Sequence, residues 1–263
     1  MPELPEVEYA ARIARAACQG KRIRAVQALH ASQRRALPDE TALAVADDVV
    51  VAVERRGKHQ LLRLASGRTL HVHFRMTGDW RVATVEDPPH RITRVLIDFE
   101  DGTRLALDDS RALATIAVVD AGVDPCPDLG PEATDPSFNA EWLAQRLAAR
   151  RGPIKPTLLD QRLVAGIGNI YASEALWYAH VDPRRPANRL RQPQYAALAA
   201  GVKRAMRKAL EHPERYYGVD GVSDAVRFNV YDREGKGCRR CRAPIVRLVQ
   251  AGRSSYYCRS CQR

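Results

Sequence analysis

The feature that most constrains how this chain can fold is a set of four cysteines close to its C-terminus. They form two Cys-x-x-Cys pairs separated by 16 residues, Cys238/Cys241 and Cys258/Cys261. Two such pairs on short hairpins bring four thiolates into the tetrahedral geometry of structural zinc, with Zn–S bonds of about 2.3 Å. Four protein ligands leave no open position, so this zinc would fold a small domain rather than catalyse. An iron–sulfur ligand set or metal-free reduced thiols are the alternatives.

The rest of the chain gives no sign of secretion or membrane insertion. No apolar run approaches the roughly 20 residues that span a bilayer, and the N-terminus lacks the basic and apolar regions of a signal peptide. We therefore expect an intracellular, cytoplasmic protein that associates with the nucleoid, with no membrane partner and no disulfides. Cys18 and Cys126 stand alone and are expected to be small buried apolar residues.

Charge is unevenly divided along the chain, whose formal net charge is +11. Residues 1–150 hold 20 Lys and Arg against 22 Asp and Glu, whereas residues 151–263 hold 22 against 9. A region this basic favours a polyanion, because each neutralised phosphate releases condensed counterions. A solvated basic surface without a partner is the simpler alternative. The arginines around the four cysteines favour nucleic acid: Arg239, Arg240, Arg242, Arg247, Arg253, Arg259 and Arg263.

Hydrophobic periodicity divides the chain into two domains. Apolar residues at helical spacing between Val7 and Cys18, followed by Gly20, predict a helix that begins almost at the first residue. Short β-rich runs follow and predict an antiparallel sandwich or barrel; they cover 49–54, 60–65, 69–74, 94–99, 103–107 and 115–119.

A proline-rich linker at 120–137 separates this region from a helical one. The helices are expected at 139–149, 155–164, 169–179 and 192–211. The predicted domains are therefore 1–127 and 133–263, and we expect the second to end in a zinc finger at 229–263.

Two further motifs each have a functional and an ordinary interpretation. Gly166-x-Gly168 precedes a helix that starts at Asn169, where backbone amides and Lys155 suit a phosphate, although Gly-x-Gly is also common in tight turns. Pro2 and Glu3 suit a helix start. Alternatively, removal of Met1 exposes a secondary amine that the helix dipole keeps nucleophilic, with glutamates nearby for proton transfer.

Three separated signatures together resemble the formamidopyrimidine-DNA glycosylase/endonuclease VIII family, and the resemblance runs from Pro2 to the last cysteine. They are residues 2–8 (PELPEVE), residues 163–174 (LVAGIGNIYASE) and the terminal zinc finger. The resemblance implies an α+β fold: an N-terminal helix plus antiparallel β-sandwich, then a helical domain with a helix-two-turn-helix and a zinc-finger β-hairpin. It also implies one structural zinc per chain and a monomer.

The resemblance implies that domain 1–127 is catalytic and that domain 133–263 binds DNA. It also implies roles for individual residues. Pro2 is similar to the family's nucleophile and Glu3 to its acid/base, while Glu6 and Tyr231 fall on family positions with less defined roles. Four residues match contacts to DNA phosphates: Lys58, Lys155, Asn169 and Arg253.

The family also inserts side chains into the stack that the damaged nucleotide vacates. Met76 matches its methionine wedge and Arg111 the arginine that faces the orphaned base. Leu113 stands where the formamidopyrimidine branch usually has Phe, which removes base stacking worth roughly 1–3 kcal/mol. The segment 218–229 lacks that branch's longer lesion-capping loop, and residues 227–231 are closer to the endonuclease VIII branch. The choice between oxidised purines and oxidised pyrimidines is therefore open.

From these residues we expect a bifunctional DNA glycosylase and AP lyase of base excision repair. Its partner would be duplex DNA that contains oxidised bases or abasic sites, and it would cleave the abasic strand by β,δ-elimination. The alternative is a non-catalytic zinc-finger protein that senses damaged or distorted DNA.

Overall fold

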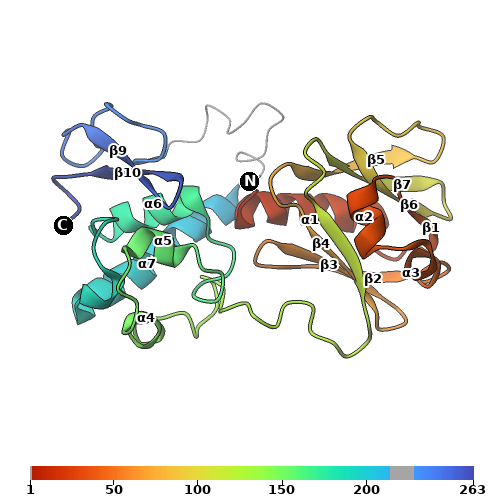
Figure 1. Cartoon of the computed structure of the whole chain (residues 1–263), viewed down its shortest axis with the longest axis horizontal. Coiled ribbons are helices and arrows are strands. Elements are labelled where there is room, and N and C mark those ends of the chain that lie inside the picture. The colour runs from red at the N-terminus through yellow and green to blue at the C-terminus, as the bar shows by residue number, and fades with distance from the viewer. Residues whose placement is uncertain (1, 214–227) are drawn as a thin grey trace. The chain divides into compact units, whose positions relative to one another are not determined.

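The computed structural model describes residues 2–213 and 228–263 of the chain. The chain divides into two compact units, Met1–Pro127 and Asp128–Arg263, and each is described separately below (Figure 1).

Unit 1 consists of helix α1 (Leu4–Cys18), two short helices and two four-stranded antiparallel sheets. The first sheet has the order β1-β6-β7-β5 and the second the order β2-β3-β4-β8. The remaining bounds are α2 Ala31–Ala36, α3 Asp39–Leu43, β1 Ile23–Ala28, β2 Val50–Arg56, β3 His59–Leu64, β4 Thr69–His73, β5 Gly78–Thr84, β6 Thr93–Phe99, β7 Thr103–Asp109 and β8 Thr115–Val119. The predicted N-terminal helix and sandwich are confirmed, and two separate sheets exclude the closed barrel.

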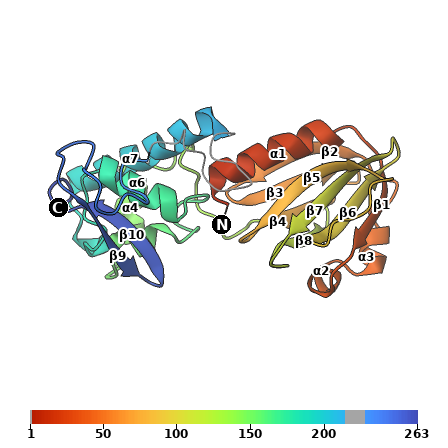
Figure 2. The same cartoon turned by 90° about the horizontal axis from the view of Figure 1, so that it is seen from above.

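Burial of one face of each strand holds this sandwich together. Fully buried side chains include Leu62, Leu70, Ile97 and Leu105, from one sheet or the other. Helix α1 packs against β2, β5 and β7 (Figure 2), and its buried face carries small residues such as Ala10 and Ala14. Small side chains let the helix approach the sheets closely, so the start of α1 is held on a rigid base.

In unit 1, the strands β1 and β5 and the short helices α2 and α3 were not predicted from the sequence. The strands β1 and β5 were not predicted because polar residues interrupt their apolar pattern: Arg24 and Gln27 in β1, and Asp79 and Arg81 in β5. Both become strands by pairing with neighbours: β1 pairs with β6, and β5 pairs with β7. These two strands therefore depend on pairing with neighbouring strands, which the local sequence pattern does not reveal.

The described residues of unit 2, 128–213 and 228–263, form helices and one two-stranded hairpin. Its bounds are α4 Ala140–Leu147, α5 Ile154–Leu158, α6 Asn169–Tyr178, the 3-10 helix η1 Ala187–Arg189, α7 Gln192–Glu211, β9 Ile245–Gln250 and β10 Arg253–Cys258. Helix α6 packs against α7, where Gly201 is required because a Cβ there would lie 2.5 Å from the carbonyl oxygen of Ala175. Among residues 2–213 and 228–263, no helix has the length and apolar character needed to cross a membrane.

The expected helix at 155–164 is wrong in its second half, because α5 ends at Leu158. The chain turns at Asp160, whose carboxylate accepts the Arg162 N–H at 3.1 Å and whose carbonyl oxygen accepts the Leu163 N–H at 2.9 Å. An Asp that binds nearby backbone amides competes with helix propagation. This turn leads to the Gly-x-Gly segment and to the start of α6.

Candidate active site and nucleic-acid interface

Two buried carboxylates lie at the start of α1, beside Pro2. Glu3 is the N-cap residue and only 2% exposed, and its backbone N–H donates to Glu6 Oε2 at 2.9 Å. This reciprocal arrangement is a capping box, which fixes the conformation of the first helical turn. Pro2 is half-buried next to it. The local sequence thus holds a proline and two acids in one rigid turn at the positive end of a helix dipole.

Lys58 lies in the two-residue turn between β2 and β3. Gly57, the other turn residue, has a φ of +58°, and Arg56 pairs with His59 across the turn. A positive φ at this position favours glycine. The strand that leads into the turn is tied to α1, because Arg55 Nε donates to Glu8 Oε2 at 2.8 Å. Lys58 is largely buried, so this turn holds its ammonium group in a defined place.

One buried carboxylate, Asp109, organises the loop that carries Arg111 and Leu113. Its Oδ1 accepts the Arg111 N–H at 3.1 Å, and its Oδ2 accepts the N–H groups of Leu113 at 2.6 Å and Ala114 at 2.7 Å. Thr77 also donates its hydroxyl to Asp109. Burial raises the pKa of Asp109, but these hydrogen bonds outweigh burial and lower it. Asp109 was not predicted as a site residue, although its place beside the Ser110-Arg111 turn was a usable signal.

The side chains on these two loops are exposed. Met76 is 37% exposed and Leu113 is 44% exposed. Arg111, two residues before Leu113, is also exposed. Since Thr77 follows Met76 and binds Asp109, the same carboxylate holds the turn of Met76 and the loop of Leu113. The structure therefore brings the predicted wedge residues of unit 1 onto two connected loops.

In unit 2, Lys155 joins the start of α6 to the zinc-finger hairpin. Its ammonium group donates to Asn169 Oδ1 at 2.5 Å and to the carbonyl oxygen of Ser254 at 2.8 Å. Lys155 is only 1% exposed. Asn169 is the first residue of α6, and Ser254 follows Arg253. One buried cation therefore positions two of the residues that were predicted to contact phosphate.

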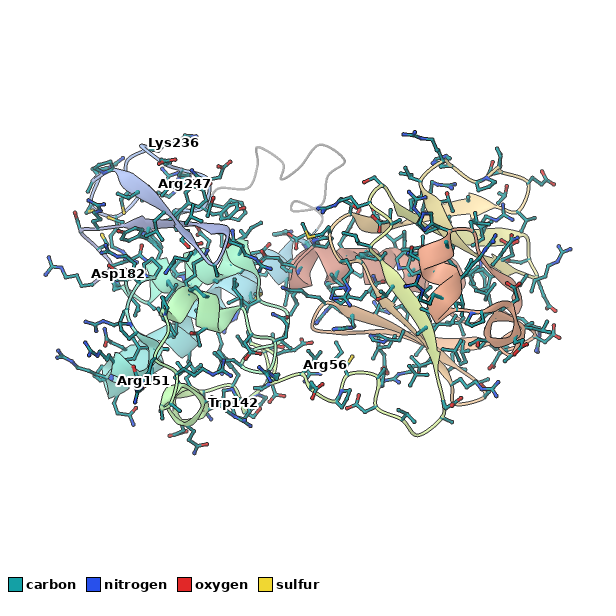
Figure 3. All side chains as sticks on the ribbon, viewed as in Figure 1. Arg56, Trp142, Arg151, Asp182, Lys236 and Arg247 are labelled. Atoms are coloured by element: carbon teal, nitrogen blue, oxygen red, sulfur yellow. The ribbon has the colours of Figure 1, made fainter. Side chains whose placement is uncertain are left out.

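Arg253 lies at the tip of the β9–β10 hairpin and is exposed. The two turn residues before it, Ala251 and Gly252, have φ values of +47° and +72°, as in a type I′ turn. Figure 3 labels two further basic residues in this part of unit 2, Lys236 and Arg247. All seven arginines that the sequence analysis associated with the cysteines are exposed. The described residues of this hairpin thus present a basic surface.

A second carboxylate that the sequence analysis gave no role, Glu174, fixes the segment before the zinc finger. It accepts backbone N–H groups from Asn229, Val230 and Tyr231 at 2.8–3.1 Å, and it is 4% exposed. The ring of Tyr231 packs edge-on against Tyr256 of β10. Glu174 therefore positions Tyr231, which had been singled out from the sequence.

The four cysteines Cys238, Cys241, Cys258 and Cys261 lie together, with all four sulfur atoms within 4.8 Å of one another. Two of the separations are 3.9 Å, between Cys238 and Cys261, and 3.5 Å, between Cys241 and Cys258. A tetrahedral zinc with bonds of about 2.3 Å requires S···S separations of about 3.8 Å. The sulfur positions therefore fit zinc.

Trp177 supports this cluster from α6. Its indole N–H donates to Cys238 Sγ at 3.4 Å, and the guanidinium of Arg240 lies 4.0 Å from its ring centroid. Burial raises the pKa of Cys238, but the Trp177 hydrogen bond and backbone N–H groups lower it to about 6. A thiolate is the form that binds a metal, and Trp177 favours it at Cys238. Burial and the neighbouring thiols instead raise the pKa of Cys258 and that of Cys261.

Comparison with known proteins bears on all three signatures. The model of the formamidopyrimidine-DNA glycosylase N-terminal domain matches residues 1–116, and that of the H2TH domain of the same enzyme matches 129–217. A model described as a zinc finger found in FPG and IleRS matches 235–263. The chain belongs to the formamidopyrimidine-DNA glycosylase family. The prediction of one structural zinc per chain, held by the four cysteines, is confirmed.

Whole-chain relatives agree with this assignment. Formamidopyrimidine-DNA glycosylases of Roseiflexus sp. and Chloroflexus aurantiacus are each 39% identical over 274 residues, which covers all of this chain and 100% and 98% of theirs. A Lactococcus lactis formamidopyrimidine-DNA glycosylase bound to DNA with an AP site has a TM-score of 0.89 at 28% identity and 99% coverage of both chains. MutM in complex with DNA that contains carbocyclic 8-oxo-G has a TM-score of 0.90 at 28% identity, with full coverage of both chains.

Apart from the cysteines, Lys58 in the β2–β3 turn and Tyr231 beside Tyr256, the structure groups the predicted site residues in three places. Pro2 and Glu3 start α1, the Met76, Arg111 and Leu113 side chains lie on the loops that Asp109 ties together, and the Lys155–Asn169–Arg253 group lies in unit 2. The predicted short lesion loop falls largely within 214–227, outside the described residues.

Proposed function

We propose that this chain is a bifunctional DNA glycosylase and AP lyase whose nucleophile is the amine of Pro2, exposed when Met1 is removed. The substrate class is duplex DNA that carries formamidopyrimidines or other oxidised purines and pyrimidines. The observation that carries the assignment is the rigid first turn of α1, in which Pro2 adjoins the buried acids Glu3 and Glu6. The family membership supports base excision repair as the process, and we infer that the enzyme acts on the DNA of the nucleoid.

The chemistry divides into base removal and strand cleavage. The lone pair of the Pro2 nitrogen attacks C1′, and the electrons of the glycosidic bond leave with the damaged base, which takes up a proton. The attached nitrogen then loses its proton, and its lone pair expels O4′, which takes up a proton as the deoxyribose ring opens. Because the amine is secondary, the resulting C1′ iminium carries a positive charge and acidifies the C2′ protons. Loss of a C2′ proton expels the 3′ phosphate, and a second elimination expels the 5′ phosphate. Glu3 is proposed to move protons in these steps.

Extrusion of the damaged nucleotide is required, because C1′ cannot be attacked in the stack. Met76 and Leu113 are proposed to occupy the vacated space, and Arg111 to face the orphaned base; the exposure of all three side chains supports this. Both apolar residues lie on loops that Asp109 restrains, so little conformational entropy remains to be lost when they insert.

Unit 2 is proposed to hold the DNA backbone through Asn169 and Arg253, and Lys58 of unit 1 to contact a phosphate near the lesion. Lys155 acts through its neighbours, since its ammonium group is buried between Asn169 and Ser254. It orients both phosphate-binding residues and adds positive charge behind them.

Borohydride trapping tests the proposal directly. The full chain, with Met1 removed as verified by mass spectrometry, is incubated with abasic-site duplex and reductant. We expect a covalent protein–DNA adduct whose attachment site is the N-terminal proline. Tight binding of the same duplex without an adduct would instead identify a non-catalytic DNA-binding protein.

A further inference from the structure

Three histidines gather on one side of the β3–β4 hairpin in unit 1. His59 pairs with His73 in the sheet register, and His71 lies two residues before His73 on the same face. His59 Nδ1 lies 2.7 Å from His71 Nε2, and the two rings are stacked with centroids 4.8 Å apart. Gln60 and Val72, which alternate with these residues, are buried. The histidines therefore lie on the face of this sheet that points away from those two residues.

A cysteine from a distant part of the sequence completes this cluster. Cys126 follows β8, and its sulfur lies 3.9 Å from His71 Nε2. One ligand atom each from His59, His71 and Cys126 lies within 4.8 Å of the others. The Cys126 N–H donates to Asp124 Oδ1 at 2.8 Å, which fixes the backbone, and the side chain is 8% exposed. Among the described residues, this is the one group of metal-type ligands besides the four cysteines.

We propose that His59 Nδ1, His71 Nε2 and Cys126 Sγ form a second metal site, which binds a zinc-class divalent ion. Two imidazoles and a thiolate are ligands that such borderline ions prefer. In contrast to the four-cysteine site, three protein ligands leave a fourth position for water.

The observed distances lie close to those that an ion requires. Tetrahedral zinc with Zn–N of about 2.05 Å and Zn–S of about 2.3 Å sets an N···N separation of about 3.3 Å and an N···S separation of about 3.6 Å. The 2.7 Å between His59 Nδ1 and His71 Nε2 must therefore widen, and the 3.9 Å between His71 Nε2 and Cys126 Sγ must shorten, each by some tenths of an ångström. The ion replaces the hydrogen bond that the two ring nitrogens share.

The charge balance of binding follows from the protonation states. The ligating forms are two neutral imidazoles and a thiolate, so the ion competes with protons at these three groups. The Cys126 thiol gives up its proton to solvent as the S–metal bond forms. The thiolate charge offsets repulsion from Lys58, Arg56 and Arg75, which face the histidines.

A bound ion would join three separate segments of unit 1. It would cross-link β3, β4 and the segment that leaves β8. It would also lie near the open end of the β3–β4 hairpin, where Lys58 precedes β3 and Arg75 follows β4. Anything that binds the folded state and not the unfolded state stabilises the fold. Zinc should therefore raise the melting temperature of unit 1.

Metal stoichiometry of the full-length protein tests the site. The protein is incubated with excess Zn²⁺, freed of unbound metal by desalting, and its zinc per chain is measured by elemental mass spectrometry. We expect about two ions in the wild type and about one in Cys126→Ala and in His71→Ala. The matched controls Cys18→Ala and His90→Ala should keep both ions, since each removes the same side chain elsewhere in unit 1.

Either of two results would overturn the proposal: a single zinc per wild-type chain, or an unchanged second ion in Cys126→Ala. The wild-type count decides the matter even if a variant fails to fold. As a second measurement, Co²⁺ is added to protein that already holds zinc in the four-cysteine site. A thiolate-to-cobalt charge-transfer band is expected in the wild type and not in Cys126→Ala, and its absence from the wild type would also contradict the site.

Discussion

At the scale of single residues, buried carboxylates do most of the positioning. Glu6 caps the turn that begins with Glu3, Asp109 holds two loops of unit 1, and Glu174 holds the backbone around Tyr231. Each accepts backbone N–H groups, and a charged acceptor makes such hydrogen bonds roughly twice as strong as neutral ones. Acids therefore place Arg111, Leu113 and Tyr231, whereas the cation of Lys155 places Asn169 and Arg253.

Replacing the nucleophile tests the chemistry separately from binding. In Pro2→Gly we expect single-turnover base excision to fall at least about a hundredfold, an order set by the loss of a well-placed catalytic group. Affinity for undamaged duplex should stay within a factor of two, because no phosphate contact changes. The control Pro136→Gly alters an exposed proline far along the sequence and should excise normally. Parental excision rates in Pro2→Gly would contradict the assignment.

Asp109→Asn should destabilise unit 1 by about 2 kcal/mol, because the amide loses an acceptor oxygen and buries an unpaired N–H. Urea unfolding measures this, with Asp120→Asn, at an exposed carboxylate, as the unaffected control. The pH dependence has a definite sign. Since folding lowers the Asp109 pKa from its ordinary 3.8, its contribution is present above about pH 4 and is lost as pH falls through the lower folded-state value. The assignment would be contradicted if acidification lowered the free energy of unfolding of Asp109→Asn as much as that of the wild type.

At the scale of elements, the zinc hairpin and the start of α6 are coupled by Lys155. If an apolar side chain replaced Lys155, the carbonyl oxygen of Ser254 and Asn169 Oδ1 would both lose the ammonium group that donates to them. The free energy of metal binding is also the folding energy of a hairpin this small. Lys155 and the zinc therefore both stabilise the surface that the hairpin and the start of α6 form.

Lys155→Met should therefore act on stability as well as on binding. We expect unit 2 to lose about 1–3 kcal/mol, since two acceptors become unsatisfied, and DNA affinity to fall together with it. Arg253→Ala, at an exposed side chain, should weaken DNA binding while the free energy of unfolding stays unchanged. Differential scanning calorimetry measures the stability of each variant and DNA titration measures its affinity, so the two effects can be told apart. Full stability in Lys155→Met would show that its contacts are not structural.

Cys241→Ser should remove the four-cysteine zinc, unfold the β9–β10 hairpin and abolish DNA binding, while unit 1 stays folded. A substitution is preferred to chelation, because a chelator would also strip the proposed histidine site. Hydrogen exchange should show lost protection in 245–258 and unchanged protection in β3 and β4. Unchanged DNA affinity in a zinc-free Cys241→Ser protein would refute the hairpin's role.

At the scale of the whole molecule, the basic residues of the second half set the response to salt. Neutralising one phosphate releases about 0.9 counterions. Arg253→Ala should reduce the slope of log K against log[salt] by about one unit on damaged and undamaged duplex alike. Arg111→Ala should change discrimination between opposite bases and leave the slope nearly unaltered. A slope change in Arg111→Ala without one in Arg253→Ala would reverse the two assignments.

The sequence by itself determined the features that depend on local spacing. The cysteine pairs predicted the zinc site, small apolar residues at helical spacing predicted α1, and three motifs in order predicted the family. Tertiary structure decided what depends on partners far along the chain. Strands β1 and β5 required their neighbours, Lys155 became buried because Ser254 lies 99 residues away in sequence but within hydrogen-bond distance, and Cys126 met His71 across 55 residues. Local pattern reports propensity and periodicity, whereas burial and pairing of a polar group are set by whichever segments the folded chain brings against it.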